Sequence, residues 1–400
     1  MQHNVSMKRV IPFFKKKFIS PAIKFIHDSK SIGITLLACT FISLLLANSP
    51  VSSHYLGFIN ATIPGFDSHF LPHSLLHFIN DGLMSIFFFL AGMEIKRELN
   101  NGELSDIKNA ILPIGGAIGG MLFPALIFLL LNKGSIYKDG WGIPTATDIA
   151  FSIGVASLLG KKVPVALKIF LTALAIIDDL GAIAIIAFFY GSAIQLKYLM
   201  LAAVVSGIIY FINKRLAKFG WVQIVLGIVL WACMYNSGIH ATVAGVLLAF
   251  LIPTHWLALL EKKLHLPVYF IIMPIFALAN TAIILPHNTA SLLTDQLSVG
   301  ILFGLFIGKP LGITLVCMYL VKRGYAKLPA NTTVYQLIGV GILAGIGFTM
   351  SIFIATLAFT DTALQNEAKI AVLATSILAM IVGYIWLNNC KAKHTLTATN

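Results

Sequence analysis

Residues 142–154 read GIPTATDIAFSIG, and residues 339–351 read GVGILAGIGFTMS. Both segments lie inside long apolar stretches, and both carry the proline or glycines that interrupt a helix. Paired interrupted helices in two corresponding parts of a chain are typical of transporters with an ion site at the middle of the membrane. Glycines also serve close packing of membrane helices, which is an alternative explanation for the second segment. It explains the first less well, because proline, two threonines and an aspartate lie there within five residues.

The composition of the whole chain is that of a membrane protein. Of its 400 residues, 58% are hydrophobic and 11% are charged, whereas soluble domains have roughly 45–50% and about 25%. A helix needs about 20 apolar residues to cross a membrane, so the chain has room for about twelve spans. This excludes a soluble enzyme, a nucleic-acid-binding protein and a secreted disulfide-bonded domain. The basic residues behind the net charge of +13 therefore indicate which ends of the spans face the cytoplasm.

We accordingly expect an all-α polytopic membrane protein with three parts along the chain. Residues 1–30 carry seven Lys and Arg residues together with aromatic residues, and they are expected to form an amphipathic cytoplasmic tail on the membrane surface. Residues 31–390 form a single transporter domain, and residues 391–400 form a cytoplasmic C-terminal tail. Within the domain, residues 50–74 are polar and turn-rich, which predicts an extracytoplasmic loop or β-hairpin. The predicted spans are 31–49, 75–98, 110–131, 137–159, 165–190, 195–213, 219–234, 238–253, 268–285, 298–320, 335–359 and 366–388.

The distribution of basic residues sets the orientation of these spans. With a cytoplasmic N-terminus, the cytoplasmic segments hold 23 of the 28 Lys and Arg residues and the opposite face holds four, as the positive-inside rule requires. Both termini are then cytoplasmic. Spans 3–5 start on the inside and spans 10–12 on the outside, so the two triplets have opposite topology, and each contains one interrupted helix.

Four ionisable residues stand in the middle of predicted spans: Asp148, Asp178, Asp179 and Lys309. A charge there costs about 2.5–3.5 kcal/mol on insertion scales, so it needs a partner or a function. Asp178 and Asp179 point about 100° apart around a helix but can face one cavity. Carboxylate oxygens suit Na⁺, Li⁺ or H⁺, and we expect no cofactor. Lys309 can pair with either aspartate or with carbonyl ends of interrupted helices, while Asp148 can neutralise two converging helix N-termini.

Other titratable residues lie near the ends of the predicted spans. His240 stands at the extracytoplasmic start of the eighth span and is either a hydrogen-bonded structural residue or part of a pH response. The cytoplasmic ends collect Glu94, Arg97, Glu261 and His265. These residues form either a solvated charged face or a funnel whose protonation gates access.

Six motifs of the chain resemble those of the bacterial NhaA sodium–proton antiporters over roughly residues 30–390. The motifs are GMEIKREL (92–99), GWGIPTATDIAFSIGV (140–155), LTALAIIDDLGAIAII (171–186), SGIHATVAG (237–245), GKPLGI (308–313) and GILAGIGFTMSIFIATLAF (341–359). The NhaA family is itself a known case of inverted repeats, so the resemblance also implies that feature. It implies a bacterial inner-membrane Na⁺(Li⁺)/H⁺ antiporter, and a homodimer joined through residues 50–74.

The resemblance also assigns roles to residues. By position, Asp178 and Asp179 match the cation-binding aspartates. Thr147, Asp148 and Gly347 match residues of the two interrupted helices, and Lys309 matches the lysine that pairs with an aspartate and offsets helix dipoles.

The same comparison by position implies a set of pH-response residues, which are Glu94, Arg97, Glu261 and His265, and to which we add His240. Lys262 stands where the family has histidine, so the pH at which the family becomes active cannot be assumed for this chain.

If the two aspartates hold protons that Na⁺ displaces, about two protons exchange for one Na⁺ and the cycle is electrogenic.

Three other functions are alternatives to antiport. An intramembrane aspartyl protease needs two aspartates on separate helices in YD and GxGD motifs, which the sequence lacks. A prenyl transferase needs DDxxD, but residues 178–182 read DDLGA. A cation channel has the same inventory of charges and stays open as an alternative, to be separated from an antiporter by transport driven uphill by a pH gradient.

Overall fold

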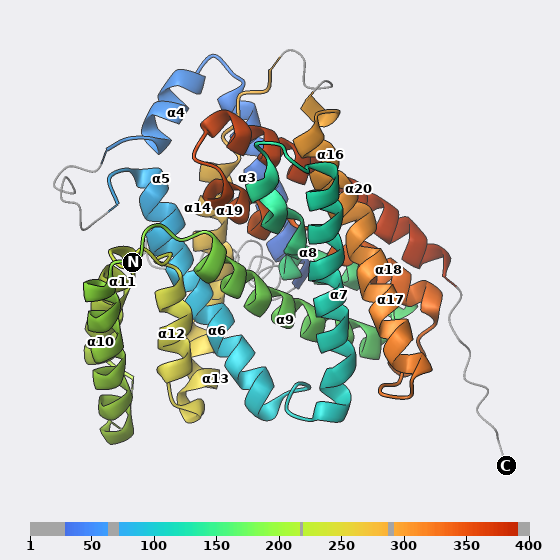
Figure 1. Ribbon diagram of the computed structural model, residues 1–400, viewed down its shortest axis with the longest axis horizontal. Coiled ribbons are helices and arrows are strands. Elements are labelled where there is room, and N and C mark those ends of the chain that lie inside the picture. The colour runs from blue at the N-terminus through green and yellow to red at the C-terminus, as the bar shows by residue number, and fades with distance from the viewer. Residues whose placement is uncertain (1–28, 63–71, 217–218, 287–291, 391–400) are drawn as a thin grey trace, which may run out of the picture.

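The computed structural model describes residues 29–62, 72–216, 219–286 and 292–390 (Figure 1). Regular structure in these ranges is helical, apart from an isolated antiparallel bridge between Thr62 and Ser74. The all-helical membrane fold predicted from composition is thus confirmed. The predicted tails 1–30 and 391–400 fall outside the described residues, except for the start of the first helix.

The helices follow one another with short connections. In the first half they are α3 (Ser29–Ala47), α4 (Ser52–Ile59), α5 (Leu75–His77), η2 (Phe78–Leu83), α6 (Met84–Asn101), α7 (Ile107–Leu131), η3 (Lys138–Thr145), α8 (Ile149–Leu158), η4 (Gly160–Lys162) and α9 (Val165–Phe189). In the second half they are α10 (Leu196–Arg215), α11 (Trp221–Tyr235), α12 (Val243–Leu251), α13 (Thr254–Pro267), η5 (Val268–Ile272), α14 (Met273–Asn280), α16 (Gln296–Phe303), η6 (Gly304–Gly308), α17 (Lys309–Lys322), α18 (Val334–Ala344), α19 (Phe348–Ala358) and α20 (Thr362–Asn389). The segments η2, η5 and η6 are π-helical turns that continue directly into α-helices.

Seven helices of the described ranges are long and apolar enough to cross a membrane, and the number rises to nine if each of two bent pairs is one span. The bent pairs are α3 with α4, at 119°, and α18 with α19, at 47°. Helix η3–α8 and helices α11 and α12 are too short to count by this criterion. The described residues thus account for seven to nine spans, and the number twelve stays a prediction.

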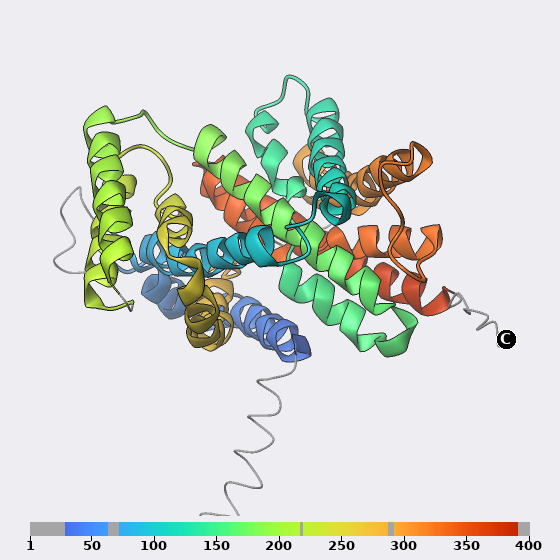
Figure 2. The same cartoon turned by 90° about the horizontal axis from the view of Figure 1, so that it is seen from below.

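Helix α9 runs through the centre of the bundle (Figure 2), where it packs against α6, α7, α8 and α18. Most of its side chains are apolar, and one face, which includes Ile169, Leu180 and Phe188, is exposed at the surface of the bundle. Helices α10 and α11 stand at one edge of the molecule (Figure 1) and share a separate apolar cluster with α12. The aspartates of α9 therefore lie in the main core, far from that edge.

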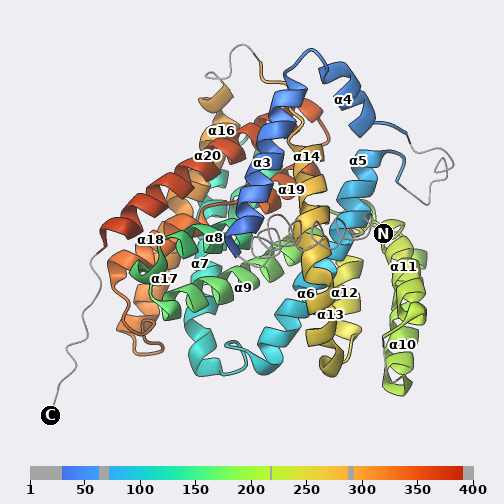
Figure 3. The same cartoon turned by 180° about the vertical axis from the view of Figure 1, so that it is seen from behind.

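Two further contacts fix the elements around α9. Helices α7 and α17 approach so closely that a Cβ at Gly119 or Gly312 would overlap the carbonyl oxygen of the other glycine. Small residues at such a crossing let membrane helices meet through their backbones. Helix α3 lies beside α14 and packs over α8 on the opposite side of the molecule (Figure 3).

The stretch 50–74, predicted as a loop or hairpin, is described in part. It contains the short helix α4, followed by the isolated antiparallel bridge between Thr62 and Ser74. Residues 63–71 lie outside the described ranges, so a hairpin there stays a prediction.

Candidate functional site

The two segments singled out in the sequence are interrupted helices that cross each other at their breaks. Helix η3 contains Pro144 and gives way to extended backbone at residues 146–148 before α8 begins. The second break, between α18 and α19, falls at residues 345–347, where two glycines stand. The Asp148 N–H donates to the Ile346 carbonyl oxygen over 2.7 Å, which joins one break to the other.

Hydroxyl side chains near the breaks satisfy backbone carbonyls that the interrupted helices leave without partners. Thr147 Oγ1 donates to the Ala344 carbonyl at the end of α18, over 2.8 Å. On the other side of the crossing, Ser351 Oγ donates to the Ile143 carbonyl in η3, over 2.7 Å. In a membrane interior no water replaces such bonds, so these residues hold the unwound backbone in place.

Gly347 occupies the position immediately before α19 begins. A Cβ at this residue would overlap the Ser351 hydroxyl, which itself bonds across the crossing. The glycine therefore keeps space for that hydroxyl.

Asp148 lies at the start of two helices. Its carboxylate accepts from the Phe151 N–H, at 3.3 Å, and so caps α8. It also accepts from the Thr349 N–H in the first turn of α19, at 3.2 Å, and from the Thr349 hydroxyl. The N-terminus of a helix carries a partial positive charge. Two such ends converge on this one carboxylate, which is 2% exposed.

Lys309 is fully buried, and its ammonium group has three acceptors. Nζ donates to the Thr145 carbonyl at 2.6 Å, to Thr147 Oγ1 at 2.5 Å and to Asp178 Oδ2 at 2.5 Å. An ammonium group has three N–H donors, so all of them are used. The structure therefore places Lys309 both against the carbonyl end of η3 and against one aspartate, and the aspartate is Asp178.

Asp178 and Asp179 are buried in the middle of α9, with 1% and 5% exposure. Among the described residues, Oδ1 of each aspartate has no hydrogen-bond partner. An unpaired buried oxygen is costly, so these two atoms are acceptors to which a proton or a small cation can bind. The two carboxylates differ in one contact, because Oδ2 of Asp178 accepts a hydrogen bond from Lys309.

The residues assigned to a pH response lie in two separate places. Arg97 in α6 donates to Glu261 in α13 and, over 3.0 Å, to the neighbouring Glu98. His265 lies one turn further along α13, with its ring 4.7 Å from that of Tyr269. Glu94 stands one turn before Glu98 on α6. These residues form one group at the end of α6, whereas His240 lies elsewhere.

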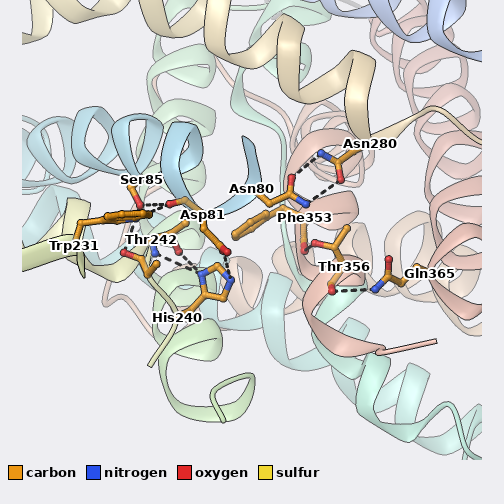
Figure 4. Close-up of polar contacts among 11 residues, drawn as sticks. Asn80, Asp81, Ser85, Trp231, His240, Thr242, Asn280, Phe353, Thr356 and Gln365 are labelled. Atoms are coloured by element: carbon orange, nitrogen blue, oxygen red, sulfur yellow. Dashed lines mark hydrogen bonds and ion pairs between the residues drawn. The ribbon is translucent and has the colours of Figure 1, made fainter. Parts of the chain in front are cut away.

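His240 stands between α11 and α12 and contacts Asp81 (Figure 4). Its Nε2 lies 3.2 Å from Asp81 Oδ1, and its Nδ1 lies 2.9 Å from the Thr242 hydroxyl. A cavity of about 200 Å³ borders both His240 and Asp81, with Tyr190 and Tyr235 also in its wall. Sequence reasoning missed Asp81, an acid that stands near the first end of the predicted span 75–98 and not in its middle.

The chain is similar to known proteins over most of its length. The family model described as Na⁺/H⁺ antiporter 1 matches residues 23–387. The protein named Na(+)/H(+) antiporter NhaA of Flavobacterium psychrophilum is 48% identical over 372 residues, which cover 91% of this chain and 94% of that protein. The protein of the same name from Cytophaga hutchinsonii is 46% identical over 376 residues, 91% of this chain and 94% of that one. The one from Proteus mirabilis is 45% identical over 380 residues, 92% and 97%. The resemblance noted in the motifs is thus confirmed, and the chain belongs to the Na⁺/H⁺ antiporter 1 family.

Proposed function

We propose that the protein is an integral membrane Na⁺(Li⁺)/H⁺ antiporter, a secondary active transporter and not an enzyme. The names of its relatives support Na⁺/H⁺ exchange. The observation that carries the proposal is the pair Asp178 and Asp179, buried in the central helix, with Lys309 on one of them. Such a site has oxygen ligands for a hard cation and a built-in positive charge that competes with that cation.

In the proposed cycle, the Lys309–Asp178 pair is the cation-free state of the site. Na⁺ binds between the carboxylates of Asp178 and Asp179 and takes the place of the Lys309 ammonium. As Na⁺ enters, two protons leave the site, one from the Asp179 carboxyl group and one from the Lys309 ammonium group. Two protons exchanged for one Na⁺ move one net charge per cycle, which is worth about 2.3 kcal/mol per 100 mV of membrane potential.

The crossing supports this site and gives it a means of alternating access. Thr147 orients Lys309, because its hydroxyl accepts from the ammonium and donates to α18. Asp148 balances the two converging helix ends, and Gly347 leaves space for the Ser351 hydroxyl. Small movements at the breaks then open the site to one side of the membrane or the other.

The proposal also covers regulation by pH and membrane topology. Glu94, Arg97, Glu261 and His265 set the pH response from the cytoplasmic side, and His240 contributes from the other. The chain lies in the bacterial inner membrane with twelve spans, an inverted repeat and both termini in the cytoplasm, and it dimerises through residues 50–74. Cysteine labelling tests the topology: residues 50–74 should react from outside, and residues 322–327 only after permeabilisation. The reverse pattern contradicts it.

The activity is tested in everted membrane vesicles that carry a pH gradient. Added Na⁺ or Li⁺ should dissipate the gradient, whereas K⁺ should not. In proteoliposomes, an inward proton gradient should drive Na⁺ uphill, which a channel cannot do. A rate that changes when the potential is clamped with K⁺ and valinomycin supports the two-proton exchange, and a rate indifferent to the potential points to one-for-one exchange.

A further inference from the structure

The end of α12 is held by a lysine of α6 that stands immediately before Arg97. Lys96 Nζ donates to the Phe250 carbonyl oxygen over 2.6 Å and to the Ile252 carbonyl oxygen over 2.5 Å. The last carbonyls of a helix have no partners within the helix and carry a partial negative charge, so an ammonium group is a suitable partner for them. Lys96 therefore joins the C-terminus of α12 to α6.

The connection from α12 to α13 is short, so it passes this position on to α13. Only Ile252 and Pro253 stand between the two helices. Proline fixes its own φ and restricts the residue before it, which leaves the corner little freedom. Asn213 of α10 adds a further contact, because its side-chain amide donates to the Leu251 carbonyl oxygen over 3.0 Å. The start of α13 is therefore fixed by the groups that hold the end of α12.

Helices α6 and α12 also pack without room for a side chain between them (Figure 1). A Cβ added at Gly92, one turn before Lys96, would lie 2.8 Å from the Cβ of Ala249. Near the other end of α12, a Cβ at Gly245 would lie 2.1 Å from the Ser85 carbonyl oxygen. Glycines at such a crossing let the two backbones meet. Lys96 thus completes a contact that extends along the whole of α12.

Glu261 lies two turns along α13 from the corner and contacts Arg97, the neighbour of Lys96. Helix α6 thus holds α12 through one side chain and α13 through the next. The acceptors of the two side chains differ in chemistry. Lys96 binds backbone carbonyls, which do not titrate, whereas Arg97 binds a carboxylate, which does. When Glu261 takes up a proton, the contact of Arg97 weakens and that of Lys96 remains.

We propose that Lys96 is a positioning residue for the pH response of the transporter. By fixing the end of α12 to α6, Lys96 sets where α13 starts and therefore how Glu261 meets Arg97. A well-placed arginine favours the ionised form of a carboxyl group, so this contact sets the pH at which Glu261 takes up a proton. This role of Lys96 rests on the proposed antiport and on the pH response assigned to Arg97 and Glu261.

Other charges surround the contact of Arg97 with Glu261, and they stay in place when Lys96 is changed. The charged and titratable residues of the elements around it are Glu94 and Glu98 on α6, His255, Lys262, Lys263 and His265 on α13, Tyr269 on η5, and Lys214 and Arg215 on α10. Helix α12 itself carries no charged side chain. A substitution of Lys96 can therefore act through its lost contacts or through its lost charge, and the experiment has to separate the two.

The test measures the pH profile of Na⁺-induced exchange in everted vesicles, with protein quantified by immunoblot. Lys96→Met removes the ammonium group and keeps an unbranched stem. Its profile should move to more alkaline pH, as in Arg97→Ala, because Glu261 then takes up a proton more readily. At the pH where the wild type has half its maximal rate, the rate should fall about threefold or more. Lys96→Arg keeps the charge and the donors and should restore the wild-type profile.

Two further variants separate contact from charge. In Lys96→Met/Arg97→Ala the profile should move no further than in Arg97→Ala, because two residues that act through one contact are not additive. Lys263→Met removes a charge from an exposed residue near Glu261 and should keep the wild-type profile. The proposal is contradicted if the shifts add in the double variant, or if Lys96→Met behaves like the wild type or like Lys263→Met. If Lys96→Met does not insert, Lys96→Gln takes its place with the same expected shift.

Hydrogen–deuterium exchange of the α13 amides in the purified protein gives a measurement that does not depend on transport. Exchange should be about threefold or more faster in Lys96→Met than in the wild type and in Lys263→Met, because α13 loses a fixed start, and Lys96→Arg should match the wild type. Equal exchange in Lys96→Met and the wild type contradicts the role of Lys96. A wild type that moves no Na⁺ contradicts the antiport alone, and the amide exchange then still decides the role of Lys96.

Discussion

Two ion pairs of this protein differ in how much water reaches them. In the pair of Lys309 with Asp178, both side chains are 0% exposed and the atoms lie 2.5 Å apart. In the pair of Arg97 with Glu261, the arginine side chain is 43% exposed and the glutamate 10%. Loss of one partner in the first pair leaves a charge in a medium that cannot solvate it, whereas in the second pair water takes over. The same kind of contact thus has different consequences at the centre of the bundle and at its end.

The largest effect is expected from the aspartates of the central pair. Asp178→Asn and Asp179→Asn should each abolish exchange, because each removes a proton carrier and a cation ligand. Both variants should still insert, since asparagine is neutral and similar in shape. The measurement is Na⁺-induced dissipation of the pH gradient in everted vesicles, with protein quantified by immunoblot and Asp139→Asn as control. Wild-type exchange by either variant excludes a shared carboxylate site.

A large effect on stability is expected from Lys309. Lys309→Ala leaves Asp178 without its partner, and breaking a buried pair typically costs about 3–5 kcal/mol. Lys309→Arg keeps the charge and should restore part of the loss. The control is Lys322→Ala at the exposed end of the same helix, where a surface substitution changes stability by less than about 0.5 kcal/mol. Equal melting temperatures for Lys309→Ala and Lys322→Ala would mean that the buried pair does not stabilise the fold.

The smallest effect on stability is expected at the half-exposed pair. Arg97→Ala should change the free energy of unfolding by less than about 1 kcal/mol, because exposed pairs are weak. Its effect should appear in the pH profile. Without the positive charge the neighbouring carboxyls take up protons more readily, so the activity profile should move to more alkaline pH. A profile that does not move, in vesicles assayed across the pH range, would remove Arg97 from the pH response.

The comparison also shows what the sequence could predict. The two breaks follow from Pro144 and from the glycines at 345 and 347, because these residues interrupt helices locally. Asp178 and Lys309 could be singled out because charges are expensive inside apolar spans. Their pairing could not be deduced, because they lie 131 residues apart and either aspartate had the right charge. Asp81 was missed because it stands near the end of its predicted span, where an acid is less unusual.

Other features depend on tertiary structure alone. The three acceptors of Lys309 come from η3, the break after it and α9, which no local pattern brings together. Such clusters form only when helices from distant parts of the chain pack against one another.

The central claim is that Na⁺ and protons compete for the carboxylates of Asp178 and Asp179. The most direct measurement is the number of protons released when Na⁺ binds to the purified protein in weakly buffered detergent solution. The account predicts that about two protons leave per Na⁺ bound, and that the apparent affinity for Na⁺ falls as the pH is lowered. Binding of Na⁺ without proton release, or with an affinity that does not depend on pH, would contradict it.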